Sequence, residues 1–457
     1  MRDRRFYILT VFLFVLQLVS VAVGLKQHRD FERERTEATI EIRRQWIEQD
    51  AKNPHAAAHY GIYVFPARTP LALLDKGVTS SVGASIFLEA HRQNQPRHRP
   101  AQDSALVDRF GELTVATILQ LFFPLILIAL TYSAFSDERA KGTFRLSKAL
   151  GLNTREFVLG KFLGIFACIG LISLPGAVVA AIGLYFGAGQ NLVSLAISGI
   201  SLLLGYVLYS LTIVGVALSV SAVLPSRAAM AALCGFWVFN SIIVPILAAD
   251  LASKTFPLPT VVDFYRKVRS DLTGGESGHD VQHTKYDNLI SDTLKQYKVK
   301  RVEDLPFNYF GYSLQKMEEE DTRVYETNLA SLRELYRRQN AFVLSFGVIA
   351  PSLYIRSYSM AFAGTDLDAQ QKFAKEAESY RRIMVKTLNE YIAFEGKDKK
   401  EVIAGKELFQ RIPEFHPSVE SPQDLINRTS SSLAGLAAWA GMSVLLALLL
   451  ASRMSTE

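Results

Sequence analysis

Six apolar runs interrupt an otherwise polar chain of 457 residues and set its predicted organisation. Each run is long enough for an α-helix to cross a hydrocarbon core of about 30 Å at a rise of about 1.5 Å per residue. The predicted transmembrane helices cover residues 1–25, 113–133, 160–187, 192–223, 228–249 and 431–452. The first run follows three arginines, as in a signal peptide, but it lacks a convincing small-residue cleavage site before Lys26. We therefore predict an uncleaved first span.

Basic residues orient the predicted helices. The polar segment 134–159 between the second and third runs is rich in Lys and Arg, which is typical of cytoplasmic loops. Arg227, in the short turn between the fourth and fifth runs, falls on the same side. Strict alternation then places both termini in the cytoplasm and residues 26–112 and 250–430 outside.

The two outer segments are far too long to be connecting loops. Helical spacing of apolar positions over 314–335 and 367–394 predicts two long helices, and Ile62–Phe65 is prone to form a short strand. Residues 342–363 imitate a span, but they carry Arg356 near the middle, so we assign them to the core of the outer domain, lying on the bilayer. The predicted fold class is an all-α polytopic membrane protein with six transmembrane helices and a mainly α-helical extracytoplasmic domain formed by two insertions.

Composition and motifs exclude several classes of function. The net charge is +6, but the basic residues are dispersed and form no stripe with interleaved aromatics, so no nucleic-acid partner is expected. The two cysteines lie in apolar runs and predict no disulfide framework. The sequence has no phosphate-binding loop, no Gly-x-Ser-x-Gly and no His-Glu-x-x-His, so we do not predict an enzyme. Apart from Lys161 at the edge, the four central runs carry no charged residue, which argues against an ion-coupled transporter.

All eight histidines lie in the outer segments. Two pairs have the four-residue spacing that places both imidazoles on one face of a helix, as a copper or zinc site requires. The weak metal-ligand candidates are His55, His59, His279 and His283. Polar residues collect in a polar segment in any case, and glycines beside the second pair favour a loop. We therefore predict no metal.

The segment 136–162 has a pattern of its own: Asp137-Glu138, Gly142-Thr143, an apolar turn, Arg155, and Gly160-Lys161. It resembles the first cytoplasmic loop of ABC-2-type exporter permeases, which contains a short coupling helix. The resemblance implies that this loop docks on a separate ATPase subunit. The implied coupling residues are Asp137, Glu138, Gly142, Thr143, Arg145, Arg155, Gly160 and Lys161.

A second motif resembles the ABC-2-type permeases with a large extracytoplasmic domain, a group linked to the maturation of multicopper enzymes. The matching residues are His59, Tyr60, Gly61, Pro66, Gly77, Gly83, Glu89, His91, Gly364 and Thr365. Relatives generally carry a charged elbow segment before the first helix, whereas only five residues precede Phe6 here. We expect either that the elbow is absent or that the true start lies upstream.

The resemblance implies the permease subunit of an ABC-2-type exporter in the bacterial inner (plasma) membrane. ATP and Mg²⁺ would be bound by the partner ATPase, with no cofactor on this chain. With six spans, a second permease is expected, as a homodimer or a paired paralogue, and membrane lipid surrounds both. Two alternatives stay open: a non-transporting ABC-type component, or a metal or copper-enzyme maturation factor, acting on an extracytoplasmic protein through the outer domain.

Overall fold

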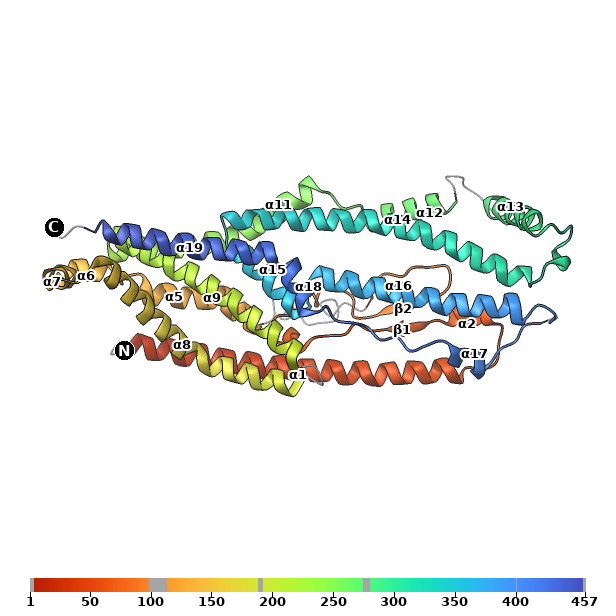
Figure 1. Ribbon diagram of the computed structural model, residues 1–457, viewed down its shortest axis with the longest axis horizontal. Helices are drawn as coiled ribbons and strands as arrows, with labels where there is room; N and C mark the ends of the chain where they lie inside the picture. The colour runs from red at the N-terminus through yellow and green to blue at the C-terminus, as the bar shows by residue number, and fades with distance from the viewer. Residues whose placement is uncertain (1–3, 98–112, 188–191, 274–279, 400, 455–457) are drawn as a thin grey trace.

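The computed structural model describes residues 4–97, 113–187, 192–273, 280–399 and 401–454. The chain is mostly helical (77%). Figure 1 shows an elongated molecule whose long helices run near its long axis, with the two chain ends at the same end. The structure thus agrees with the helical membrane-protein class that the sequence predicts.

The first helix, α1 (Arg4–Glu48), is a single element of 45 residues. It continues past the predicted end of the first span at residue 25 and carries the chain into the outer part of the molecule (Figure 1). Ion pairs one turn apart, such as Arg35 with Glu32 at 2.6 Å and Arg44 with Glu48 at 2.8 Å, support its polar half. The first predicted span and the polar segment that follows it thus share one continuous helix.

Four further helical stretches build the rest of the apolar half, together with α8 (Thr154–Gly187). They are α4–η3–α5 (Val115–Thr117, Ile118–Phe122, Phe123–Thr131), α9 (Leu192–Val223), α10–η4–α11 (Ser226–Val238, Phe239–Ile243, Val244–Thr255) and α19 (Ser430–Ser452). Among the described residues, five helices are long and apolar enough to cross a membrane: Tyr7–Glu48, Val115–Ala140, Leu192–Val223, Ser226–Thr255 and Ser430–Ser452. The helix α8 covers the remaining predicted run but is not among these five.

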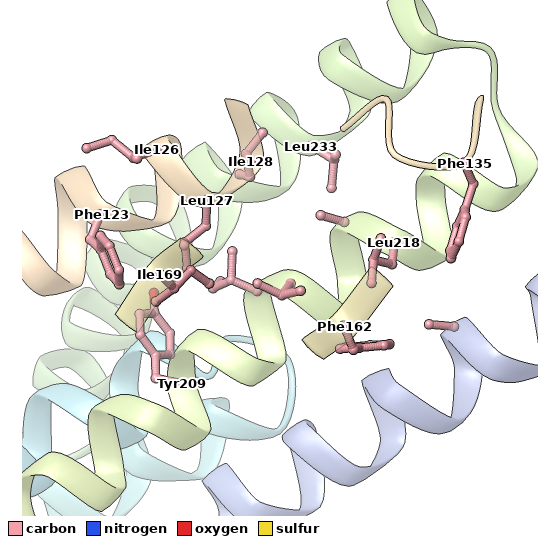
Figure 2. Close-up of a cluster of buried hydrophobic side chains, with 14 of the residues drawn as sticks. Phe123, Ile126, Leu127, Ile128, Phe135, Phe162, Ile169, Tyr209, Leu218 and Leu233 are labelled. Atoms are coloured by element: carbon pink, nitrogen blue, oxygen red, sulfur yellow. The ribbon is translucent and has the colours of Figure 1, made fainter. Parts of the chain in front are cut away.

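Buried hydrophobic side chains hold this bundle together. Figure 2 shows Phe123, Ile126, Leu127, Ile128, Phe162, Ile169, Tyr209, Leu218 and Leu233 between α5, α8, α9 and α10. The π-helical segments η3 and η4 each end close to a proline, Pro124 and Pro245. Because proline lacks an N–H group, it cannot donate the regular bond to the carbonyl four residues earlier, and a wider turn accommodates the gap.

The helices α9 and α19 lie in close contact along their length. A Cβ atom added to Gly215 of α9 would lie 2.4 Å from Ser443 Oγ and 2.9 Å from the Ser443 backbone carbon. Only glycine allows this approach, as is common between membrane helices.

We expect Gly215→Ala to lower the free energy of unfolding by about 1–3 kcal/mol, because the added methyl group separates α9 from α19. Gly199→Ala on the same helix is the matched control, since nothing lies within 4 Å of its added Cβ. Thermal unfolding of the detergent-solubilised protein measures both variants. Equal midpoints for the two variants would contradict the expectation.

Segments far apart in sequence form the other half of the molecule. The helix α2 (Pro54–Tyr60) precedes β1 (Ile62–Val64), which pairs antiparallel with β2 (Ile86–Leu88). These elements share one hydrophobic cluster with the end of α1, α16 (Leu367–Glu390) and α17 (Lys406–Arg411). The Trp46 indole N–H donates to the Phe409 carbonyl at 3.1 Å inside this cluster.

The remaining elements complete the outer half and its connections. They are η1 (Pro70–Leu73), α12 (Val261–Leu272), α13 (Asp280–Tyr297), η5 (Val302–Asp304), α14 (Tyr309–Ser345), η6 (Phe346–Val348), η7 (Tyr391–Glu395) and α18 (Pro422–Arg428). The helices α14 and α16 correspond to the two long helices predicted from apolar spacing. The helix α14 extends beyond the periodic segment at both ends, whereas α16 begins where predicted and ends at Glu390, after which η7 continues the helical stretch.

The helix α15 (Ser352–Ala363) forms the second half of the span-like segment 342–363. It packs against α9 and α19 of the apolar half, as well as against η1 and α18. Its Arg356 donates to the Ser241 carbonyl at 2.9 Å. That carbonyl stands four residues before Pro245 and so has no regular helical donor. Arg356 therefore supplies the missing hydrogen bond. The free-energy cost that the sequence suggests for an arginine at the middle of a span does not include this bond.

Candidate functional site

Two short helices form the end of the molecule that lies opposite the outer half (Figure 1). They are α6 (Ser136–Ala140) and α7 (Thr143–Ala149), joined at Gly142. Gly142 has a φ of +74°, in the left-handed region that glycine adopts without strain. Nothing lies within 4 Å of an added Cβ, so the backbone conformation rather than packing requires glycine here.

Arg139 attaches α6 to the end of α9. Its guanidinium donates to the carbonyls of Ser221 at 3.2 Å and Leu224 at 3.1 Å, and also to that of Ala222. These are among the terminal carbonyls that an α-helix leaves without internal donors. A cation at this end is also favoured by the helix dipole. Arg139 thus caps α9 from the neighbouring loop.

Two carboxylates complete the attachment. Ser226 Oγ donates to Asp137 at 2.7 Å, and this bond is the main reason that the pKa of Asp137 is lowered. Lys161 of α8 pairs with Glu138 at 2.6 Å. Burial would raise the pKa of Glu138, but bonds from Lys161 and the Thr143 hydroxyl outweigh it, so the pKa is lowered. The loop is therefore bonded to α8, α9 and α10.

The orientation of α7 follows from one buried side chain. Phe144 is 2% exposed and packs on Phe157 of α8, with ring centroids 5.4 Å apart. The opposite side of α7 consequently faces outward. Leu146 on that side is 61% exposed, and Leu150, directly after the helix, is 80% exposed. An apolar pair four residues apart on a polar, exposed tip is typical of a protein contact.

The structure divides the predicted coupling residues into two groups. Asp137, Glu138, Gly142, Thr143 and Lys161 shape and attach the loop, whereas Arg145, Arg155 and Gly160 are exposed. Sequence reasoning missed Arg139 as an attachment and Leu146 and Leu150 as surface residues. The sequence of a helix as short as α7 does not show which of its sides faces outward. That side is known only once the structure shows that Phe144 is buried.

The glycines of the outer motif occupy positions where a side chain does not fit. An added Cβ would lie 2.5 Å from the Leu88 carbonyl oxygen at Gly61 and 2.4 Å from that of Thr365 at Gly77, and both glycines have positive φ. Val78 N also donates to the Thr365 carbonyl at 2.9 Å. Gly77 and Thr365 thus join the two outer segments through backbone contacts, whereas the Gly61 contact lies within the first outer segment.

The other motif residues have smaller roles in the described contacts. Gly83 approaches the Pro96 backbone carbon, with 2.4 Å for an added Cβ, and Gly364 has a φ of +66° at the end of α15. Glu89 accepts from the Asn94 amide at 2.9 Å. Tyr60 is the last residue of α2, and Pro66 lies two residues after β1.

Asp75 introduces a carboxyl group into the bundle that the sequence did not predict. It is 6% exposed and accepts from Ser359 Oγ at 2.5 Å and from Gly77 N at 2.9 Å. The Tyr206 hydroxyl of α9 lies 2.9 Å from the same serine oxygen and accepts from Gln120 at 3.0 Å. Asp75 thus brings a carboxyl group from the polar segment 26–112 to the bundle, whose four central runs carry no charged residue of their own apart from Lys161 at the edge.

A cavity of about 680 Å³ lies between α1, η1, the α4–η3–α5 stretch, α8 and α9. Its lining is almost entirely apolar and includes Val21, Leu74, Leu119, Ile169 and Leu203. Such a cavity can hold an apolar chain or ring system, whereas it offers few hydrogen bonds to a polar solute.

The structure separates the four weak metal candidates. His279 lies outside the described residues, and His283 is in α13. His55 and His59 lie together on α2 and are joined by His91. Burial, and then the neighbouring His91 and His59, lower the pKa of His55 to about 4, whereas a hydrogen bond with Glu318 raises the pKa of His91.

Comparisons with known proteins identify the family to which the chain belongs. A family model described as ABC-2 family transporter protein matches residues 1–292, and a domain of unknown function, DUF3526, matches residues 262–418. No curated protein and no solved structure shows a significant match. The resemblance to ABC-2 permeases with a large additional domain is confirmed, and the chain is a multi-pass membrane protein. It belongs to the ABC-2 family of transporter proteins, whose members are non-enzymatic transmembrane components.

Proposed function

We propose that this chain is the permease subunit of an ABC-2-type exporter, driven by a separate ATPase that docks on α6 and α7. The observation that carries the proposal is the exposed pair Leu146 and Leu150 on a tip that is bonded directly to the bundle helices. An ATPase bound to this tip would contact the apolar side chains on its outward face. The bonds on the inward face would transmit a movement of the ATPase to α8 and α9.

The arrangement of the chain supports the proposed topology. With α8 as a span, six helices cross the inner membrane. The N- and C-terminal ends lie at the same end of the molecule as α6 and α7 (Figure 1), which supports a cytoplasmic position for both termini. Residues 26–112 and 250–430 then form one extracytoplasmic domain, supported by the hydrophobic cluster that they share.

The described contacts suggest how movement would pass through the protein. The end of α9 is held by Arg139, and further along the helix α9 packs on α19 and α15 and lines the apolar cavity. A displacement of α6 would therefore change the packing around that cavity. The cavity lining favours an apolar cargo, and a second permease, identical or paired, would complete the path with membrane lipid around it.

The first test is to purify the tagged protein in mild detergent and identify co-purifying proteins by mass spectrometry. We expect an ATPase with a Walker motif, together with a second permease if the pair consists of paralogues. Recovery of an extracytoplasmic protein without an ATPase would instead support the non-transporting alternative and contradict the proposal.

We expect Leu146→Asp combined with Leu150→Asp to release the ATPase, because the removal of water from two carboxylates on the contact face costs a large free energy. The loss of binding should exceed about tenfold, measured as ATPase recovered per permease. Ile40→Asp is the matched control, since Ile40 is 65% exposed on the outer half of α1. Undiminished ATPase recovery with the double variant would exclude this face as the docking surface.

A further inference from the structure

Three imidazole rings converge at the outer end of the molecule. His55 and His59 lie one turn apart on α2, and His91 follows β2. His55 Nε2 lies 3.2 Å from His59 Nε2 and 3.4 Å from His91 Nε2. One ligand atom from each of the three side chains lies within 4.8 Å of the other two. Sequence spacing indicated the first two histidines, and the fold supplies the third.

Glu318 of α14 holds the third ring in place. Its carboxylate accepts from the His91 backbone N–H at 2.9 Å and lies 3.2 Å from His91 Nδ1. His91 has a φ of +62°, which is uncommon for a residue other than glycine and shows that the surrounding contacts fix its backbone. A proton held on Nδ1 leaves the Nε2 lone pair free to face His55. This carboxylate–histidine arrangement is the usual support of a metal-binding imidazole.

The distances suit a metal ion better than they suit bonds among the rings. Two nitrogens bound at about 2.0–2.1 Å to a tetrahedral ion are about 3.3–3.4 Å apart. His55 Nε2 has this separation from both neighbours, although one ring nitrogen can share a proton with only one of them. An ion would satisfy all three lone pairs together.

We propose that His55, His59 and His91 form a binding site for a divalent transition-metal ion, with Zn²⁺ or a chemically similar ion bound through three Nε2 atoms. Imidazole ligands are suited to this class of metal. Three protein ligands leave a fourth coordination position, and the exposure of His59 opens it toward solvent. The site lies far from the cytoplasmic tip (Figure 1), so it does not depend on the proposed ATPase contact.

The experiment uses the full-length protein, purified in detergent through a tag that contains no histidines and then stripped with a chelator. Titration with Zn²⁺ should show one tight equivalent per chain by calorimetry. His59→Ala should weaken binding by more than about 100-fold, because loss of a ligand exceeds the 10–100-fold effect of losing its support. His416→Ala, also exposed in the outer half, is the matched control and should bind as the wild type does.

Cobalt provides an independent readout. Co²⁺ bound in the wild type should give the intense visible absorption of a tetrahedral site, and this absorption should disappear in His59→Ala. Because the His59 side chain is exposed, the variant is expected to fold, which its melting profile verifies. Equal Zn²⁺ binding by His59→Ala and wild type, or no tight equivalent in the wild type, would show that the rings are joined by hydrogen bonds only and overturn the proposal.

Discussion

Replacing Arg381 with methionine should lower the free energy of unfolding by about 3–5 kcal/mol, the largest stability loss that we expect from one substitution. Arg381 of α16 is 2% exposed, and it donates to Glu378 through two nitrogens, each at 2.8 Å, and to Thr322 at 3.1 Å. It also pairs with Glu318 of α14. Without the guanidinium, Glu378 keeps only Arg382, at 3.5 Å, and Glu318 keeps only His91, at 3.2 Å, as basic partners within the described part of the chain, and α14 loses its buried ion pair with α16.

The neighbouring Arg382→Met is the matched control, because Arg382 is 43% exposed and pairs mainly with Glu326 on the surface. Surface ion pairs contribute about 0–1 kcal/mol, so this variant should differ little from wild type. Combining Arg381→Met with Glu378→Gln should recover part of the loss, since one stranded charge is then removed. Equilibrium unfolding in detergent, followed by tryptophan fluorescence, measures all three. Equal losses from Arg381→Met and Arg382→Met would exclude a buried ion cluster.

Hydrophobic patterning predicted the long helices because a span of about 20 apolar residues has few other uses. Hydrophobic patterning could not predict that α1 continues without a break past the end of the first span at residue 25. The outer half of α1 is stabilised by local ion pairs, which are found in any exposed helix. Likewise, Arg356 suggested an element outside the bundle. The Ser241 carbonyl is free to accept from Arg356 only because Pro245 lacks the N–H group that would otherwise bond to it. Both Ser241 and Pro245 belong to a helix that is distant from Arg356 in the sequence.

The same limit applies to the sites. Four-residue spacing indicated His55 with His59, but His91 and Glu318 join them only through the packing of β2 and α14. The coupling segment was recognisable from its spaced residues, whereas its contact face was not. Glu138, a charged residue, turns inward to hold the loop, whereas the apolar residues Leu146 and Leu150 turn outward. The general rule that polar side chains face solvent and apolar side chains are buried would place Glu138 outside and Leu146 and Leu150 inside.

Arg139→Gln should separate ATPase binding from ATPase coupling. The substitution removes the charge-assisted bonds to the Ser221 and Leu224 carbonyls, while Phe144 still fixes the outward face of α7. We therefore expect the ATPase to co-purify at wild-type levels. Its stimulation by the permease should fall by more than about tenfold, because loss of a charged hydrogen bond of about 1.5–3 kcal/mol leaves α6 attached to α9, among the described hydrogen bonds, only through the Ser221 hydroxyl, which accepts from the Phe135 and Ser136 backbone N–H groups.

The control for this prediction is Lys141→Gln, which removes a cation from the same loop. Lys141 is 70% exposed, and its ion pair with Asp137, at 3.6 Å, lies within the loop rather than reaching α9. ATP hydrolysis by the reconstituted complex, normalised to bound ATPase, should be unchanged in this variant. If Arg139→Gln also retained full stimulation, force would have to pass through Lys161 and α8 instead, and Glu138→Gln would become the uncoupling variant. Loss of ATPase binding in Arg139→Gln would show that α9 positions the docking face itself, so that docking and transmission share one structural unit.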